Sequence, residues 1–282
     1  MLNIEEITTL QLETTGLTPH VDSIIAIYVN NMRIMFKSKS PILNSKYHQI
    51  TDDMVENLSL FEDNEKIWRF FKQVKEKGNL IFLSCPEFFK EMLDPSGLDL
   101  NEFPIISLRA VLSNLKERIQ PSEYHQHFNF DPEKLNRGEQ LMFMLNHLKE
   151  EYKLTNEDLL RLSYYDGINT VIRKNQTVRI DDLNTHSLKW YFENYKEHSV
   201  AYSVAKAMLK EDGAKEFLEK SEKGRLYLEL IKYDLQNEDI LKPLFARTDE
   251  IRMERERQLN PAEPEPEAEE YSLNDDPTID YI

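Results

Sequence analysis

Three strand patterns near the start of the chain restrict its fold more than any other feature. Residues 7–12 show the alternation expected of a strand, and Ile24–Val29 is a continuous run rich in β-branched side chains. Asn30 and Asn31 then favour a tight hairpin turn into a third strand over residues 32–36. The sequence therefore predicts three antiparallel strands at the N-terminus.

The patterns that follow indicate an α/β fold. Residues 64–77 place Ile67, Phe71 and Val74 on one stripe of a helix, and Gly78 is the residue type that ends one. Residues 80–83 form a short apolar run, typical of a strand buried on both faces of a sheet. A hairpin, a helix and a further strand in this order predict the α/β class.

The chain divides into four segments by pattern. Residues 1–98 begin an α/β domain, and residues 186–258 are expected to complete it with helices. Between them, residues 99–185 are interpreted as a helical insertion, with helices over 108–119, 137–152 and 156–163. Residues 259–282 are rich in Pro and Glu, cannot form a core, and are expected to be a disordered acidic tail.

Composition restricts the partners and the compartment. The formal net charge is −16, and residues 261–282 hold eight acidic residues without any Lys or Arg, so the remainder still carries −8. This sign excludes duplex DNA binding by a broad basic face and leaves a focused groove as the means of contacting nucleic acid. No apolar run approaches ~20 residues, which predicts no membrane span. A start without a basic and apolar leader, and a single cysteine, Cys85, predict a cytoplasmic protein.

The first strand and the turn after it resemble a known motif. The residues are Gln11, Leu12 and Glu13, followed by the turn Thr14-Thr15-Gly16-Leu17. This is similar to the first motif of the DnaQ-like (RNase T-like, DEDDh) 3'-5' exonucleases, in which the strand carries Asp-x-Glu and continues into Thr-x-Gly-Leu. Residues 48–55 are also similar to the family's H-x-I-T-x-x-M-V segment. The resemblance implies a ribonuclease H-like exonuclease fold, with a mixed sheet flanked by helices.

Two later segments extend the resemblance. After the apolar strand, residues 84–93 are similar to the family's second motif, with Phe88 matching its Phe and Phe89 at the position of a metal-binding Asp. Residues 187–205 are similar to the third motif, with His198 at the position of the catalytic histidine and Ser203 at that of the last metal-binding Asp. The resemblance covers about residues 5–95 and 186–210.

The resemblance also implies a reaction, phosphodiester hydrolysis, and the residues that differ from the family's motifs are the ones that this reaction needs. The family hydrolyses phosphodiesters with two metal ions held by four carboxylates, and a histidine accepts the proton. The matching positions here are Gln11, Glu13, Phe89 and Ser203, so three of the four acids are missing and only Glu13 and His198 remain as catalytic remnants. Because Mg²⁺ favours anionic oxygen ligands, Glu13 alone is a weak metal ligand. Glu87 is the nearby acid that could replace Phe89.

Plain structural interpretations stand beside these. Glu13 could be a polar residue at a strand end, and His198 a hydrogen-bonded residue at a helix terminus. Phe89 is most simply a core residue. In the family, the turn that corresponds to Thr14–Leu17 approaches the terminal nucleotide. Here it could equally be a turn by which the chain leaves the strand.

The combined pattern predicts a catalytically degenerate exonuclease-like protein, similar to the epsilon subunit of DNA polymerase III. It would act without a cofactor as a nucleic-acid or protein interaction module in DNA or RNA metabolism. Two alternatives remain: an active 3'-5' exonuclease that uses Mg²⁺ or Mn²⁺ at an unorthodox site, and a pure protein scaffold. The expected partners are the end of a single strand and a protein that captures the apolar tip of the tail, Ile279, Tyr281 and Ile282; a solubilising tail is the plain alternative.

Overall fold

The computed structural model describes residues 2–43, 45–117, 119–165, 170–173, 176–195 and 197–259. The predicted tail contacts Ile279, Tyr281 and Ile282 lie outside these residues.

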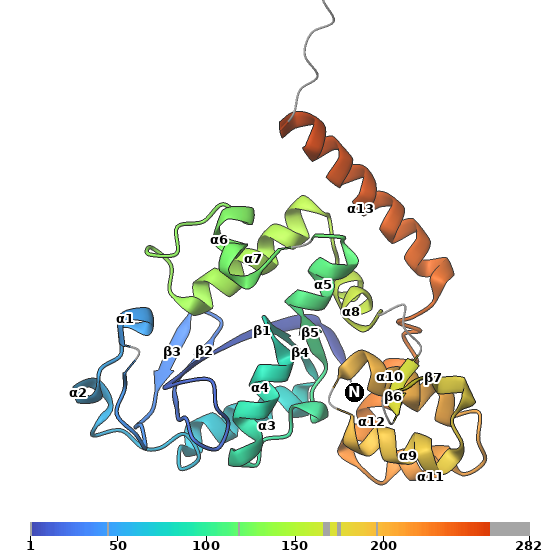
Figure 1. Cartoon of the computed structure of the whole chain (residues 1–282), viewed down its shortest axis with the longest axis horizontal. Coiled ribbons are helices and arrows are strands. Elements are labelled where there is room, and N and C mark those ends of the chain that lie inside the picture. Colours follow the sequence, from blue (N-terminus) through green and yellow to red (C-terminus); the bar gives the residue numbers. More distant parts are fainter. Residues whose placement is uncertain are drawn as a thin grey trace, which may run out of the picture.

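A five-stranded mixed sheet forms the centre of the α/β body, in the order β3-β2-β1-β4-β5 (Figure 1). Strand β1 pairs antiparallel with β2, and β2 pairs antiparallel with β3. On the other side of β1, β4 and β5 run parallel to it and to each other. The predicted α/β class and the three antiparallel N-terminal strands are confirmed. The strand bounds are β1 Asn3–Thr14, β2 Ile24–Val29, β3 Met32–Met35, β4 Asn79–Leu83 and β5 Ile105–Ser107.

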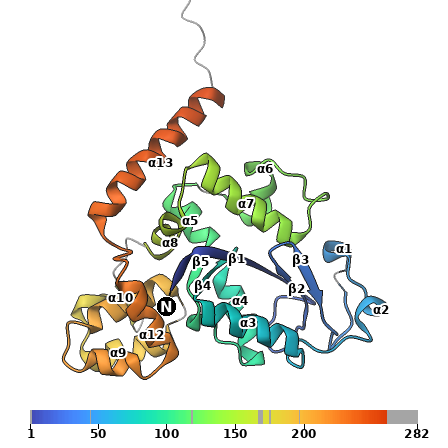
Figure 2. The same ribbon diagram turned by 180° about the vertical axis from the view of Figure 1, so that it is seen from behind.

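Helices cover both faces of this sheet (Figures 1 and 2). Alternate side chains of β4 point to opposite faces: Ile81 and Leu83 pack with helices α3 and α4, while Leu80 and Phe82 pack with α5, α7 and α8. Both faces of β4 are therefore buried, as its apolar sequence predicts. The bounds of these helices are α3 Glu65–Lys77, α4 Pro86–Leu93, α5 Leu108–Asn114, α7 Arg137–Glu151 and α8 Asn156–Tyr164.

Local capping explains the limits of α3. The Asn64 side chain accepts hydrogen bonds from the backbone N–H groups of Lys66 and Ile67, at 3.1 and 3.2 Å. At the other end Gly78 has φ 69°, the left-handed conformation that glycine adopts without steric cost. The prediction of a helix ended by Gly78 is confirmed.

The expected helical insertion over residues 99–185 is wrong in one important respect. Strand β5 lies within it and forms an edge of the central sheet, and β6 (Thr170–Arg173) and β7 (Gln176–Arg179) form a separate hairpin. A three-residue strand followed directly by a helix has no periodicity long enough to recognise in the sequence. Helix α5 is also shorter than predicted and ends at Asn114, and Lys116 takes a positive φ of 62° soon after it.

The C-terminal helices form a bundle beside the N-terminal end of β1 (Figure 1). Four of them pack together, and α13 then extends away from the bundle (Figures 1 and 2). Ion pairs from Lys116 to Asp249 (2.6 Å) and from Arg247 to Asp158 (3.2 Å) fasten α13 to the body. Within the described ranges no helix has both the length and the apolar character needed to cross a membrane. The remaining helices are α1 Ser45–His48, α2 Asp52–Val55, α6 Tyr124–His127, α9 Thr185–Asn194, α10 His198–Met208, α11 Ala214–Glu219, α12 Glu222–Ile231 and α13 Glu238–Leu259.

The N-terminus of α7 approaches the β2–β3 hairpin very closely. A Cβ atom added to Gly138 would lie 2.2 Å from the backbone oxygen of Asn30 and 3.0 Å from Cβ of Tyr28. The helix start is also fixed by a capping box, in which Asn136 accepts from Glu139 N (3.0 Å) and Glu139 accepts from Asn136 N (2.8 Å). Glycine at 138 therefore allows the first turn of α7 to reach the sheet.

We expect Gly138→Ala to destabilise the protein by about 1–3 kcal/mol, because the helix must move away from Asn30 to admit the methyl group. Asn146→Ala, at an exposed position of the same helix, is the matched control and should leave the stability nearly unchanged. Urea unfolding of both variants measures the difference. Equal unfolding midpoints for Gly138→Ala and the wild type would show that the close approach is not a real constraint.

Candidate functional site

The C-terminal half of β1 leaves one row of side chains open on the α7 face of the sheet. Leu10 and Leu12 pack on the α3 side, so Gln11 and Glu13 point to the opposite face. Strand β1 pairs with β4 only as far as Thr9, because β4 ends shortly afterwards. The chain leaving β4 brings Ser84 beside Gln11, where its Oγ donates to Oε1 of Gln11 at 3.1 Å.

Glu13 is a nearly buried carboxylate held by a cation from α7. Its side chain is 12% exposed, and its Oε1 lies 3.3 Å from Nε of Arg137, whose side chain is 45% exposed. Burial raises the pKa of Glu13, while the charges of Arg137 and of Arg33 on β3 act in the opposite direction. Oε1 is buried and has no well-aligned hydrogen bond to any described residue, so its contact with Arg137 is mainly electrostatic.

A cleft of about 230 Å³ opens beside this pair. Its polar lining includes Gln11, Ser84, Arg137 and Gln140, and Gln140 Nε2 donates to the backbone oxygens of Pro132 (3.1 Å) and Leu135 (2.8 Å). The lining contains Arg137 but no Asp or Glu. The lining of the cleft is therefore neutral to positive, although the whole protein carries a net charge of −16. The other lining residues are Pro121, Ser122, Tyr124, His125, Phe130, Pro132, Leu141 and Met144.

The turn over residues 14–17 is organised by Asp22, which the sequence analysis missed. Asp22 accepts from Thr15 Oγ1 (3.0 Å) and from the backbone N–H of Thr18 (2.8 Å). Gly16 lies so close to this carboxylate that a Cβ atom there would be 2.5 Å from it. Thr14 donates from Oγ1 to the Gly16 oxygen at 2.5 Å, and Leu17 is 80% exposed. None of these residues lines the cleft.

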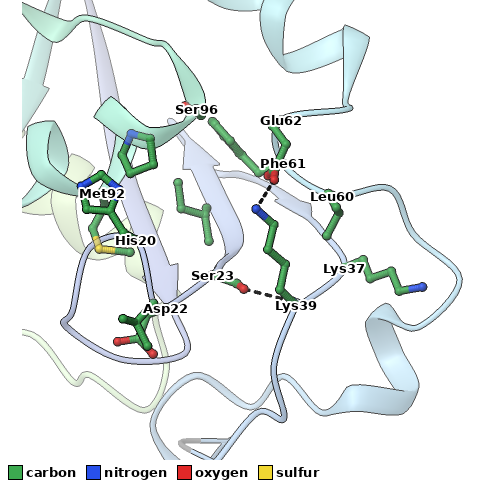
Figure 3. A pocket seen from close by; sticks show the side chains of 13 residues that line it. His20, Asp22, Ser23, Lys37, Lys39, Leu60, Phe61, Glu62, Met92 and Ser96 are labelled. Carbon is green, nitrogen blue, oxygen red and sulfur yellow. Dashed lines mark hydrogen bonds and ion pairs between the residues drawn. The ribbon is translucent and has the colours of Figure 1, made fainter.

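A second, smaller pocket of about 140 Å³ lies beside this turn (Figure 3). Lys39 pairs there with Glu62, and its backbone N–H donates to Ser23 Oγ at 3.0 Å. Phe61 and Met92 contribute apolar lining. Two lysines, Lys37 and Lys39, and two acids, Asp22 and Glu62, line this pocket. It is a weaker candidate for an anion than the cleft at Arg137, whose lining has no Asp or Glu.

Phe89 does not reach the cleft. It is 1% exposed and packs in the core with Leu10 and Leu12, on the face of the sheet opposite to Gln11. The sequence match that placed it at a metal-ligand position is therefore corrected: Ser84 approaches Gln11, and Phe89 is a core residue. Glu87 contacts Cys85 (3.5 Å) and does not line the cleft.

His198 and Ser203 are also corrected as site residues, because both lie inside the C-terminal bundle. His198 is buried, its Nδ1 lies 3.2 Å from the Tyr227 hydroxyl, and the Tyr164 ring packs edge-on against it. Burial, together with the charges of Lys90 and Lys223, lowers the pKa of His198 to about 3. This histidine is neutral at physiological pH and lies apart from Glu13.

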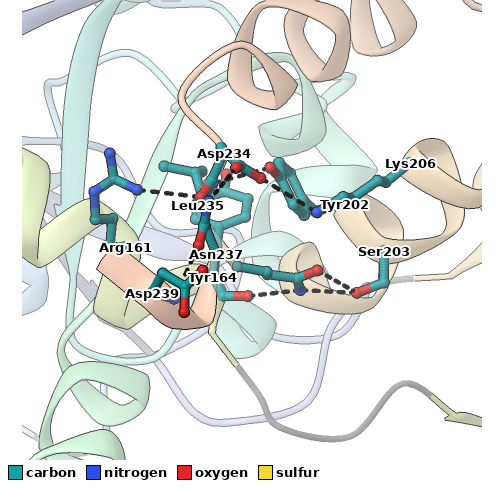
Figure 4. Close-up of polar contacts among 10 residues, drawn as sticks. Arg161, Tyr164, Tyr202, Ser203, Lys206, Asp234, Leu235, Asn237 and Asp239 are labelled. Carbon is teal, nitrogen blue, oxygen red and sulfur yellow. Dashed lines mark hydrogen bonds and ion pairs between the residues drawn. The ribbon is translucent and has the colours of Figure 1, made fainter. Parts of the chain in front are cut away.

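Ser203 belongs to a polar network that joins α8, α10 and the start of α13 (Figure 4). Its Oγ donates to Ser199 O (3.2 Å) and accepts from Gln236 Nε2 (2.8 Å), which also donates to Tyr164 O (3.0 Å). Tyr202 accepts at its hydroxyl from the backbone N–H of Leu235 at 3.0 Å. These bonds give Ser203 a structural role in holding the chain that enters α13.

The side chains at the end of β1 that could coordinate a metal do not fit a two-metal site. They are the Gln11 amide, the Ser84 hydroxyl and the Glu13 carboxylate, and the carboxylate already has the Arg137 guanidinium against it. Two divalent ions need several anionic oxygens free of competing cations. Among the residues that the structure describes, no three His, Cys, Asp or Glu side chains are grouped to hold a metal.

The sequence matches no protein-family model and no curated protein.

An aspartate at position 89, where the exonucleases of the sequence resemblance carry one, tests the core assignment. We expect Phe89→Asp to destabilise the protein by at least about 4 kcal/mol, because it creates a cavity and buries a carboxylate without a partner. Phe89→Leu, the matched apolar control, should cost only about 1 kcal/mol. Thermal unfolding gives the comparison. A stable Phe89→Asp variant would mean that position 89 lies nearer the cleft than the structure places it.

The buried His198 makes the protein sensitive to acid. Its pKa is about 3 in the folded state and about 6.5 in the unfolded chain, so the unfolded chain binds the proton first as the pH falls below about 6.5. This residue should lower the free energy of unfolding by up to about 1.4 kcal/mol per pH unit below that point. We expect His198→Gln, which can still form a hydrogen bond with Tyr227, to lose less stability in acid.

Urea unfolding of the wild type and His198→Gln near neutral pH and near pH 5 measures this difference. The half-buried His127 and His147, whose pKa values are also lowered by partial burial, are present in both proteins and cancel in the comparison. Parallel loss of stability in the two proteins would contradict a neutral, buried His198.

Proposed function

We propose that this chain is a catalytically degenerate relative of the DnaQ-like 3'-5' exonucleases, which binds single-stranded nucleic acid in its cleft without hydrolysing it. The sheet order, with β1 central, antiparallel to β2 and parallel to β4, is consistent with the ribonuclease H-like arrangement that the first motif implies. The observation that carries the proposal is the Glu13–Arg137 pair at the end of β1.

The pair argues against hydrolysis by the family mechanism. Two metal ions require a cluster of carboxylates, and Glu13 is the remaining acid on its strand end, with a guanidinium 3.3 Å away. A divalent ion placed at this carboxylate would have to displace Arg137, since two cations cannot share one singly charged oxygen pair without strong repulsion. His198, in the bundle, is not placed to act as the base in this cleft.

The cleft is better suited to hold a strand than to cut it. Arg137 supplies a charge for a phosphate, Gln11 supplies an amide, and Tyr124 and Phe130 supply an apolar wall for a base or sugar. Carboxylates are missing from this lining, although the whole protein is strongly acidic. Such a local groove is what an acidic protein requires to approach nucleic acid.

A protein scaffold is the second candidate, favoured by the exposed turn beside the second pocket. Leu17 is 80% exposed and Val21 is 71% exposed on the same turn, an apolar pair that a protein partner could cover. In this case the cleft would bind no nucleic acid.

Incubation of the protein with a 3'-labelled single strand and Mg²⁺ or Mn²⁺ tests the absence of hydrolysis. We expect the strand to remain intact, because the carboxylates that would hold two metal ions are missing. Degradation that disappears in a Glu13→Ala variant would establish an active nuclease and overturn the proposal. Fluorescence anisotropy with a short single strand at low salt tests binding, and no change on titration would favour the scaffold.

A further inference from the structure

Arg137 occupies a position that the fold determines strictly. It is the first residue of α7, between the Asn136 cap and Gly138, and Gly138 holds the helix start against the Asn30 backbone. The guanidinium is thereby directed at Glu13 through Nε, at 3.3 Å. Because the backbone on both sides is fixed, the charge is positioned before any ligand arrives.

The guanidinium has donors left over for a ligand. Arginine carries five N–H donors in a planar fork, and the closest contact with Glu13 is made by Nε. In the described part of the chain Glu13 is its only ion-pair partner, and 45% of the Arg137 side chain remains exposed, with Arg137 itself in the cleft lining. The Gln11 amide lies in the same lining, whereas both N–H groups of the Gln140 amide are already donated to Pro132 and Leu135.

We propose that Arg137 acts as a built-in cation of the cleft, binding a phosphate of a single-stranded nucleic acid in place of a divalent metal, with Glu13 as its internal counter-ion. This inference rests on the proposed function and adds the ligand group, the residue that binds it and the independence from metal. Glu13 has two opposite effects: it orients Arg137, and it competes with the phosphate for the same charge.

This arrangement predicts how the two charges respond to substitution. Removing only Arg137 would leave the nearly buried Glu13 carboxylate without its counter-ion, which lowers stability and repels phosphate at once. The informative variants are therefore Glu13→Gln, which frees Arg137, and the double variant Glu13→Gln with Arg137→Gln, which removes both charges and keeps similar side-chain volumes. Arg69→Ala, an exposed arginine paired with Glu65 on α3, is the matched control.

The experiment is a titration of a 5'-fluorescein-labelled oligothymidylate, followed by anisotropy, with EDTA and with MgCl₂. We expect wild-type binding to be equal in EDTA and in MgCl₂. Glu13→Gln should bind about 3- to 10-fold more tightly, and the double variant about tenfold more weakly than Glu13→Gln, because a charge-assisted contact is lost. The slope of the logarithm of the binding constant against the logarithm of the salt concentration should also be smaller in magnitude by about 0.7 in the double variant than in Glu13→Gln. Arg69→Ala should bind as the wild type does.

The outcomes separate the two proposals. Binding that requires MgCl₂, or equal binding by Glu13→Gln and the double variant, would overturn the role of Arg137 while leaving nucleic-acid binding in place. A wild type that does not bind the oligonucleotide at low salt in either solution would overturn the proposed function itself. Circular dichroism of each variant establishes that a loss of binding does not come from unfolding.

Discussion

The burial of one carboxylate between the sheet and α7 is the constraint on which the architecture of the cleft depends. Glu13 points away from the core of β1 and is covered by the first turn of α7, so its charge needs a partner within the protein. Arg137 supplies that partner, but only because Gly138 lets the helix approach Asn30. The strand, the hairpin and the helix are thus linked through one ion pair, and the cleft beside it is a consequence of their close approach.

Elements with strong local signals could be predicted from the sequence, and the site could be predicted only in part. Ile24–Val29 and α3 have clear patterns and clear ends, at Asn30 for the strand and at Asn64 and Gly78 for the helix. Gln11 and Glu13 follow from their place on β1. Arg137 could not be identified, since it lies far along the chain from Glu13 and only the tertiary fold joins them.

The corrected residues show why spacing alone misleads. Phe89 follows β4 at a suggestive distance, but α4 turns it into the core with Leu10, and Ser84 is the residue left beside Gln11. His198 matches a motif in sequence, yet the bundle buries it against Tyr227. Motif spacing fixes positions along the chain, whereas a site requires convergence in space. The strand β5 was missed for a related reason, because its pairing with β4 is a long-range contact without a local pattern.

A cleft that carries its own cation differs in kind from one that needs a bound ion. Gln11 accepts a hydrogen bond from Ser84, and Glu13 pairs with Arg137, so both side chains at this end of β1 have a protein partner. The ion pair offsets the charge of the nearly buried carboxylate without a bound ion. The charge that a metal would bring on binding is then a permanent part of the fold. Under the proposed function, affinity for phosphate in this cleft would depend on the balance between one guanidinium and one carboxylate.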